Sequence, residues 1–178
     1  YVANYGNQTV VAYQVTPAAP TASPTAPVLP AETWVAGTVS GAAAEGSRAV
    51  AVFTGATDVS IDPLSTDLIV CDRAANLLRR ATFDGRIDTW VGDGAAATAP
   101  GIRLAGSMWS PWFAIADAAG KVFVAEYHGC VISQVTAAGT LSLLAGSGTC
   151  AHSPGTGATA GFNGPNGLAL RGTTLFVS

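Results

Sequence analysis

Short apolar segments separated by turn-forming residues run along the whole chain. They are four to seven residues long, rich in β-branched or aromatic side chains, and bounded by Gly, Asn, Pro or Asp-Gly, which is the pattern of β-strands. No segment shows the period of an amphipathic helix, so the pattern predicts an all-β protein. The strands expected in the first half of the chain span residues 9–15, 33–36, 58–62, 68–71, 77–82 and 87–91.

The strand pattern repeats with a period of about 54 residues. Phe53, Met108 and Phe162 begin three equivalent segments, at spacings of 55 and 54. Each period holds four expected strands. Four-stranded units that recur in this way, each burying its faces against its neighbours, are typical of a β-propeller.

Four segments of the repeat share a signature. A Phe-x-x-Pro-x-Gly turn leads into an apolar strand, a Val-Ala-acid strand follows, an Asn-x-apolar-Arg strand comes next, and a strand ending in Ala-Gly closes the period. The residues that carry it are Phe162, Pro165, Gly167, Leu168 and Ala169; Gly120, Val122, Phe123, Val124, Ala125 and Glu126; Asn76, Leu78 and Arg79; and Gly139, Leu141, Leu144, Ala145 and Gly146. The chain resembles the NHL-repeat family of β-propellers along its whole length, with Ala56 and Asp58 where that family usually has Pro and Gly.

This resemblance implies one domain over residues 1–178, with about three four-stranded blades visible. Residues 1–4 match residues 69–72 at a spacing of 68, and the 14 surplus residues are explained by a Pro-rich insertion, 17–31, in the hairpin between the third and fourth strands of the first blade. Three blades are too few for an ordinary closed ring. We therefore expect part of a larger, six-bladed propeller; pairing with other chains is the alternative.

The strand order also divides the loops between two faces of the expected propeller. If strands are numbered outward from the channel, the connections from strand 2 to 3 and from strand 4 to the next strand 1 share a face. That face carries the three long loops, near residues 37–51, 92–107 and 146–161. Long loops on one face of a rigid scaffold are where such a protein binds a ligand.

Two of the three cysteines are placed for a disulfide. Cys130 is expected at the start of a third strand and Cys150 after the fourth, so an antiparallel hairpin would bring both to the same end; two unrelated thiols are the alternative. A bond would close a loop of about 20 residues and contribute about 3 kcal/mol. Cys71 lies mid-strand and is expected to be a buried, inert thiol.

Residues Asn4, Asp72 and Glu126 occupy one repeated position, just after the second strand. They are weak candidates for a calcium site, but we expect them to cap the turn that follows, since uncharged Ser178 stands at the next equivalent. His128 and His152 are the only histidines, too few for a zinc lyase or a Ser-His-Asp arrangement. We expect no catalytic residue, metal or cofactor.

The aromatic residues suggest packing and, at one place, ligand contact. Trp34 and Trp90 appear at equivalent positions in fourth strands, where we expect them to pack between blades. Trp109 and Trp112 flank Ser110 and Pro111 before a first strand. The candidate ligand-contact residues are Trp109, Trp112, Tyr127 and His128; for the two tryptophans, filling between blades is the alternative.

Several features favour the extracellular space or the cell surface. Asn7 begins an N-glycosylation sequon. The Pro-rich run resembles the modified segments of plant and algal surface proteins, which makes its prolines candidates for hydroxylation or O-glycosylation: Pro17, Pro20, Pro24, Pro27 and Pro30; an unmodified loop is the alternative. Only 11% of the residues are charged and 49% are hydrophobic, and the net charge is -3. We expect no nucleic-acid partner, and no direct membrane insertion because no apolar run reaches 18 residues.

These observations predict a non-catalytic extracellular binding or assembly module that contacts other protein chains or glycans and belongs to a longer chain or assembly. A calcium-dependent propeller hydrolase or lactonase is one alternative, and it requires carboxylates that converge at the channel. The ligand-sensing domain of an envelope receptor is the other, and it requires a transmembrane segment elsewhere in the protein.

Overall fold

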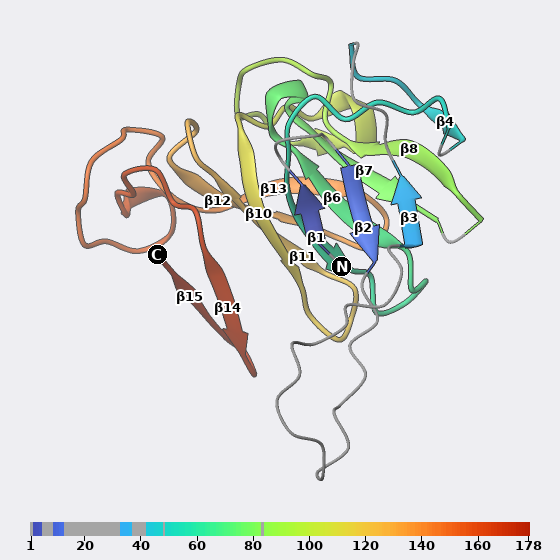
Figure 1. Cartoon of the computed structure of the whole chain (residues 1–178). Coiled ribbons are helices and arrows are strands. Elements are labelled where there is room, and N and C mark those ends of the chain that lie inside the picture. The colour runs from blue at the N-terminus through green and yellow to red at the C-terminus, as the bar shows by residue number, and fades with distance from the viewer. Residues whose placement is uncertain (1, 5–8, 13–32, 37–41, 48, 83) are drawn as a thin grey trace, which may run out of the picture.

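The computed structural model describes residues 2–4, 9–12, 33–36, 42–47, 49–82 and 84–178 (Figure 1). This part of the chain is all-β, with antiparallel sheets and three single-turn 3₁₀ helices: η1 (Arg73–Ala75), η2 (Arg103–Ala105) and η3 (Gly157–Thr159). It contains no α-helix, and no helix long and apolar enough to cross a membrane. The expected all-β class is therefore confirmed.

Two sheets in the middle of the chain each contain four consecutive antiparallel strands. The first consists of β5 (Ala56–Ile61), β6 (Leu68–Asp72), β7 (Leu77–Ala81) and β8 (Arg86–Val91). The second consists of β10 (Pro111–Ala116), β11 (Val122–Glu126), β12 (Val131–Val135) and β13 (Thr140–Ala145). The period of four strands that the sequence predicts is thus present in both.

The remaining strands form two smaller sheets and two short additions. A three-stranded sheet holds β1 (Val2–Asn4), β2 (Thr9–Ala12) and β3 (Thr33–Ala36), and a hairpin holds β14 (Leu168–Arg171) and β15 (Thr174–Val177). The two-residue strands β4 (Gly46–Ser47) and β9 (Gly101–Ile102) pair with β8 and β13; the sequence did not predict them. Within the described residues no sheet closes on itself.

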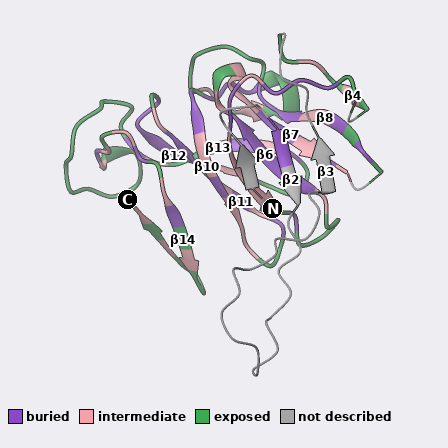
Figure 2. Cartoon of the chain, viewed as in Figure 1, coloured by how far each residue is buried: buried purple, intermediate pink, exposed green. Residues whose placement is uncertain are grey.

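The four sheets lie face against face in chain order, and buried residues concentrate between them (Figure 2). Strand β6 contributes side chains to two hydrophobic cores, one on each face. Leu68 and Val70 pack toward the β1–β3 side, whereas Ile69 and Cys71 pack toward the β10–β13 sheet. Because side chains alternate between the two faces of a strand, a strand covered on both faces reads as an unbroken apolar run.

Pairing of the strands corrects two equivalences expected from the spacings. The Ser178 N–H donates to the Gly167 carbonyl, which places Ser178 at the position of Ala125 rather than Glu126. In β8 the pairs Leu78–Val91 and Arg79–Thr89 leave Trp90 in a bulge. In β3 the pairs Val10–Ala36 and Val11–Trp34 leave Val35 in the same bulge, so the equivalent of Trp34 is Thr89 and that of Trp90 is Val35. Spacings counted along the chain do not show which residues of neighbouring strands pair.

Trp90 nevertheless has the packing role expected of it. Its ring is buried in the core between the two middle sheets, and the guanidinium of Arg80 lies over it at 4.6 Å. Arg80 also forms an ion pair with Asp62, at 2.7 Å. The side chain of Trp34 lies outside the described residues.

A buried ion pair joins β6 to β7. The Arg79 guanidinium lies 3.4 Å from the Asp72 carboxylate and also donates to the carbonyls of Ala44, at 2.7 Å, and Val52, at 3.4 Å. Both charged side chains are almost completely buried. Burial raises the pKa of Asp72 and lowers that of Arg79, since each charge has left water.

We predict that Asp72→Ala lowers the free energy of unfolding by about 3–5 kcal/mol, because it leaves the Arg79 charge buried without its partner. Asp72→Asn should cost less, since the amide oxygen still accepts hydrogen bonds. Urea denaturation measures both effects. The control is Asp88→Asn, which removes the exposed Arg86–Asp88 pair and should cost no more than about 1 kcal/mol. Equal losses in Asp72→Ala and Asp88→Asn would contradict the role given to the buried pair.

Candidate binding site

The repeated acidic residue fastens the start of its own sheet. One carboxylate oxygen of Asp72 accepts hydrogen bonds from the N–H groups of Thr54, at 3.0 Å, and Gly55, at 2.8 Å. The Glu126 carboxylate likewise accepts from the N–H of Trp109, at 2.8 Å. Thr54 and Trp109 each precede the first strand of the sheet, so we call this interaction the acid clamp.

The acid clamp corrects the predicted role of these acids. Asp72 makes no side-chain hydrogen bond to cap η1, the turn that follows it. Instead each carboxylate reaches residues 17 or 18 positions earlier in the chain. The expected turn cap at Asp72 is therefore wrong, because backbone N–H groups in the neighbouring segment need an acceptor once they are buried.

No group of three His, Cys, Asp or Glu side chains that could hold a metal ion is found in the described part of the chain. Of the weak calcium candidates, the side chain of Asn4 is outside that part. Asp72 and Glu126 lie in different sheets, where each is occupied by the acid clamp. The structure thus does not bring the two carboxylates together.

Glu126 is a buried acid with hydroxyl partners in place of a cation. Its two carboxylate oxygens accept from the hydroxyls of Thr98, at 2.7 Å, and Ser133. Ser133 stands where Arg79 stands in the preceding sheet. Burial raises the pKa of Glu126, and the hydrogen bonds oppose that rise.

The predicted disulfide is present. Cys130 precedes β12, Cys150 follows β13, and the bond joins them with their Cα atoms 5.2 Å apart. It ties the β11–β12 turn to the loop that leads toward β14. Cys71 is buried and unpaired, and burial raises the pKa of its thiol well above the usual value, so the thiol is as inert as expected.

All four candidate ligand-contact residues meet in one place, here called the aromatic cluster: Trp109, Trp112, Tyr127 and His128. The ring centroids are 4.9 Å apart for Trp112–Tyr127, 5.1 Å for Tyr127–His128 and 6.2 Å for Trp109–His128. The guanidinium of Arg73, from η1 of the neighbouring sheet, lies over Trp112 at 4.9 Å. The cluster therefore spans the seam between the two middle sheets.

Backbone contacts hold the aromatic cluster in place. The N–H of Tyr127 donates to the Ser110 carbonyl at 2.9 Å, and that of Gly129 to the Trp109 carbonyl at 3.3 Å. Ser110 has a φ of 59° and its N–H donates to the Asn76 side chain at 2.9 Å. With the acid clamp on Trp109 and the disulfide at Cys130, these bonds orient the cluster before any ligand arrives.

The members of the cluster differ in exposure. Trp109 is 43% exposed and His128 is exposed. Trp112 and Tyr127 are half-buried, and Tyr127 packs so closely on Gly164 that a Cβ there would meet its ring at 2.9 Å. Each of the two predicted roles therefore fits one tryptophan. Trp112 fills space between the sheets, whereas Trp109 faces solvent.

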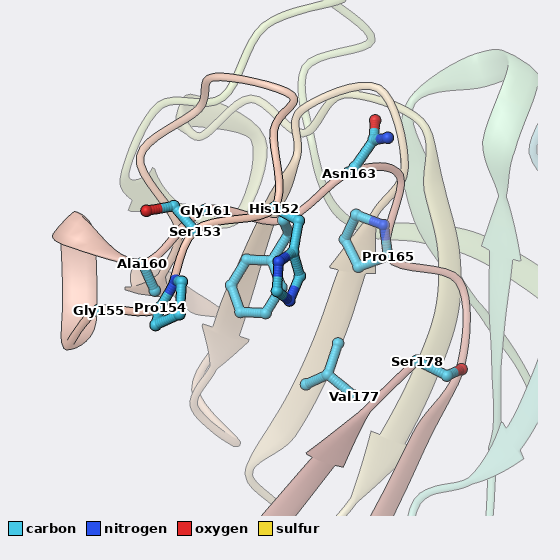
Figure 3. Close-up of a pocket in the computed structure, with 11 residues that line it drawn as sticks. His152, Ser153, Pro154, Gly155, Ala160, Gly161, Asn163, Pro165, Val177 and Ser178 are labelled. Atoms are coloured by element: carbon cyan, nitrogen blue, oxygen red, sulfur yellow. The ribbon is translucent and has the colours of Figure 1, made fainter.

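A cavity that the sequence did not predict lies beside the C-terminal hairpin, β14–β15. Its volume is about 530 Å³, and His152, Phe162, Pro165, Val177 and Ser178 are among its lining residues (Figure 3). In the β10–β13 sheet the equivalents of Phe162 and Val177, Met108 and Val124, share a core with side chains of β12 and β13. The cavity therefore lies at positions that side chains of β12 and β13 cover in the β10–β13 sheet.

Comparison with known proteins supports the fold but not an activity. No model of a known protein family matches the chain, and no curated protein matches it. A solved structure from Bacteroides thetaiotaomicron, a structural genomics protein of unknown function, is similar with a TM-score of 0.58 and 18% sequence identity. The match covers 62% of this chain and 28% of that protein.

We predict that Glu126→Gln flattens the pH dependence of stability. Since the folded-state pKa of Glu126 is raised, the folded chain binds more protons than the unfolded chain between the ordinary glutamate pKa and the raised value. Stability therefore falls as pH rises through that window, with a slope of at most about 1.4 kcal/mol per pH unit from this group. Denaturation midpoints measured across this window test the effect.

The control is Glu45→Gln, at an acid whose pKa is shifted in the opposite direction. A hydrogen bond from Thr89 lowers the pKa of Glu45, so that acid contributes stability that is present at high pH and lost as pH falls through its lowered pKa. That contribution changes with pH only below the ordinary glutamate pKa, so Glu45→Gln should leave the slope in the Glu126 window unchanged. If Glu45→Gln flattened the slope in that window as much as Glu126→Gln, the burial argument would be wrong.

Loss of the disulfide should lower the free energy of unfolding by about 3 kcal/mol, given the 20-residue separation of its cysteines. Urea denaturation of Cys130→Ser/Cys150→Ser against the parent protein measures it. Thiol titration of the unfolded protein supplies the control: without reductant only Cys71 should react. Reaction of every cysteine without reductant would show that the bond does not form.

Proposed function

We propose that this chain is a non-catalytic binding module of an extracellular protein, built from blades of an NHL-type β-propeller. The antiparallel four-stranded sheets that recur in chain order and pack face to face support the propeller assignment. The repeat signature in the sequence supports the NHL type. In this proposal the blades of the chain form part of a larger ring.

The observation that carries the binding function is the aromatic cluster. Its Trp109 and His128 side chains face solvent. The cluster lies at the ends of the strands where the β6–β7 and β11–β12 turns meet, and hydrogen bonds and a disulfide hold it in place. Rigid aromatic side chains at an exposed site supply contact area with little loss of conformational entropy on binding.

Chemistry in the described residues favours binding over catalysis. The buried acids Asp72 and Glu126 already accept backbone hydrogen bonds. His128 packs on aromatic rings, and His152 lies in a different loop, at the cavity beside the C-terminal hairpin. These positions leave the calcium-dependent hydrolase as the weaker proposal.

The extracellular setting rests on the disulfide, because such bonds persist mainly in oxidising compartments. Asn7 and the five candidate prolines lie outside the described residues, so their modification remains a prediction. The Pro-rich insertion lies outside them as well.

We predict that a ligand titrated onto the protein changes its tryptophan fluorescence through Trp109. The probes are a panel of neutral oligosaccharides and a panel of short extended peptides. At least one class should bind saturably to the parent protein, and Trp109→Ala should weaken that binding by about tenfold or more. Phe176→Ala removes an aromatic side chain that is 49% exposed elsewhere and serves as the matched control.

Two results would overturn the proposal. One is equal affinity of the parent protein and Trp109→Ala for every probe that binds. The other is a rise in melting temperature with calcium ions that both Asp72→Asn and Glu126→Gln abolish, since calcium held by those acids would support the hydrolase instead.

A further inference from the structure

Beside the aromatic cluster lies a small cavity of about 160 Å³, lined by Arg73, Ala74, Asn76, Ala96, Trp109, Ser110 and His128. Pockets that enclose whole small molecules hold roughly 300–1,000 Å³. The space between Trp109 and His128 thus fits one side chain of a longer ligand that continues across the surface. A polymer is the class of ligand that this geometry suits.

The rings of the cluster are tilted rather than coplanar. Their planes meet at 37° for Trp112–Tyr127, 46° for Trp109–His128 and 80° for Tyr127–His128. Tilted rings form ridges with a valley between them, whereas stacking on a sugar needs one flat open face. Ridged aromatic surfaces are what proline-rich peptides in the polyproline II conformation dock into.

The polar groups at the site are also compatible with a peptide. Both ends of the Asn76 side-chain amide are engaged, one by the Ser110 N–H and the other by the Gly94 carbonyl. Within the described residues no hydrogen bond engages the indole N–H of Trp109 or the imidazole of His128. A peptide in the polyproline II conformation offers such donors its exposed backbone carbonyls.

The chain itself contains a segment of this chemistry. Residues 16–30, TPAAPTASPTAPVLP, include five prolines and no charged residue. A neutral ligand suits a surface of aromatic rings on which the Arg73 guanidinium is already stacked, over Trp112. Repeated proline at this density favours the polyproline II conformation, so little entropy is lost when such a segment binds.

The topology places both ends of this segment at the opposite end of the strands from the cluster. In the three-stranded sheet Asn4 pairs with Thr9, as Asp72 pairs with Leu77 beside the cluster. The chain leaves β2 at Ala12 and returns at Thr33, which pair at the opposite edge of the sheets (Figure 1). The two residues that flank the segment, Ala12 and Thr33, therefore lie at the opposite end of the strands from the cluster.

We propose that the aromatic cluster binds the proline-rich segment of a second copy of this chain. This inference rests on the proposed function, because it names a ligand for the binding surface proposed there. Because the two contacting surfaces differ, the contact is head-to-tail, and contacts of that kind build open chains of molecules unless the rotation closes a ring.

The first test is a titration of the synthetic peptide TPAAPTASPTAPVLP, which has no tryptophan, into the parent protein while its tryptophan fluorescence is followed. We expect saturable binding that Trp109→Ala weakens at least about tenfold and Phe176→Ala leaves unchanged. A peptide with all five prolines replaced by alanine should bind at least about tenfold more weakly. Unfolding curves of each variant confirm that the fold is retained.

The second test is sedimentation velocity of the whole chain over a range of concentrations. The parent protein should self-associate, and both Trp109→Ala and deletion of residues 17–30 should leave it monomeric at the same concentrations. A parent protein that stays monomeric, or association unchanged by both variants, overturns the inference.

These tests separate the two proposals. If the peptide fails to bind while an oligosaccharide binds and loses affinity in Trp109→Ala, the inference is wrong and the proposed function stands. If the alanine-substituted peptide binds as well as the parent peptide, recognition does not depend on proline and the inference is also wrong. If no probe of either class responds to Trp109→Ala, both proposals fail.

Discussion

The acid clamp is the interaction on which the arrangement of the site depends. A carboxylate at the end of the second strand accepts N–H groups from the segment that enters the first strand of the same sheet. In a buried position those N–H groups would otherwise lack an acceptor, which costs about as much free energy as a lost hydrogen bond. The clamp therefore fixes where each sheet begins, and at Glu126 it also fixes the backbone of Trp109.

The two clamps differ in how the buried charge is accommodated. Asp72 has the guanidinium of Arg79 beside it, whereas Glu126 has the hydroxyls of Thr98 and Ser133. The first arrangement ties β6, β7 and the segment around Val52 into one unit. The second leaves the edge of the β10–β13 sheet without a buried cation, and there the disulfide adds a covalent tie between Cys130 and Cys150. The acid clamp and the disulfide therefore both hold the backbone that carries the exposed aromatic rings.

The sequence pattern predicted the features that depend on residues close together in the chain. Alternating faces and turn residues located most strands, and the position of Cys130 and Cys150 at one end of a hairpin predicted their bond. The pattern could not reveal that Asp72 and Glu126 reach back 17 or 18 residues, nor that Thr89 rather than Trp90 takes the position of Trp34. Nor could it reveal the cavity beside Val177 and Ser178, which depends on how the β14–β15 hairpin lies against the loop that contains His152 and Phe162. Tertiary contacts decide all three.

The account centres on a preformed aromatic surface at the seam between two sheets, with Trp109 exposed and Trp90 buried. The most direct measurement is the NMR spectrum of the tryptophan indole N–H groups, recorded while the peptide TPAAPTASPTAPVLP is added. The account predicts that the signal of Trp109 moves most, that Trp112 moves less, and that Trp90 does not move. Signals that all stay in place, or a shift of Trp90 as large as that of Trp109, would contradict it.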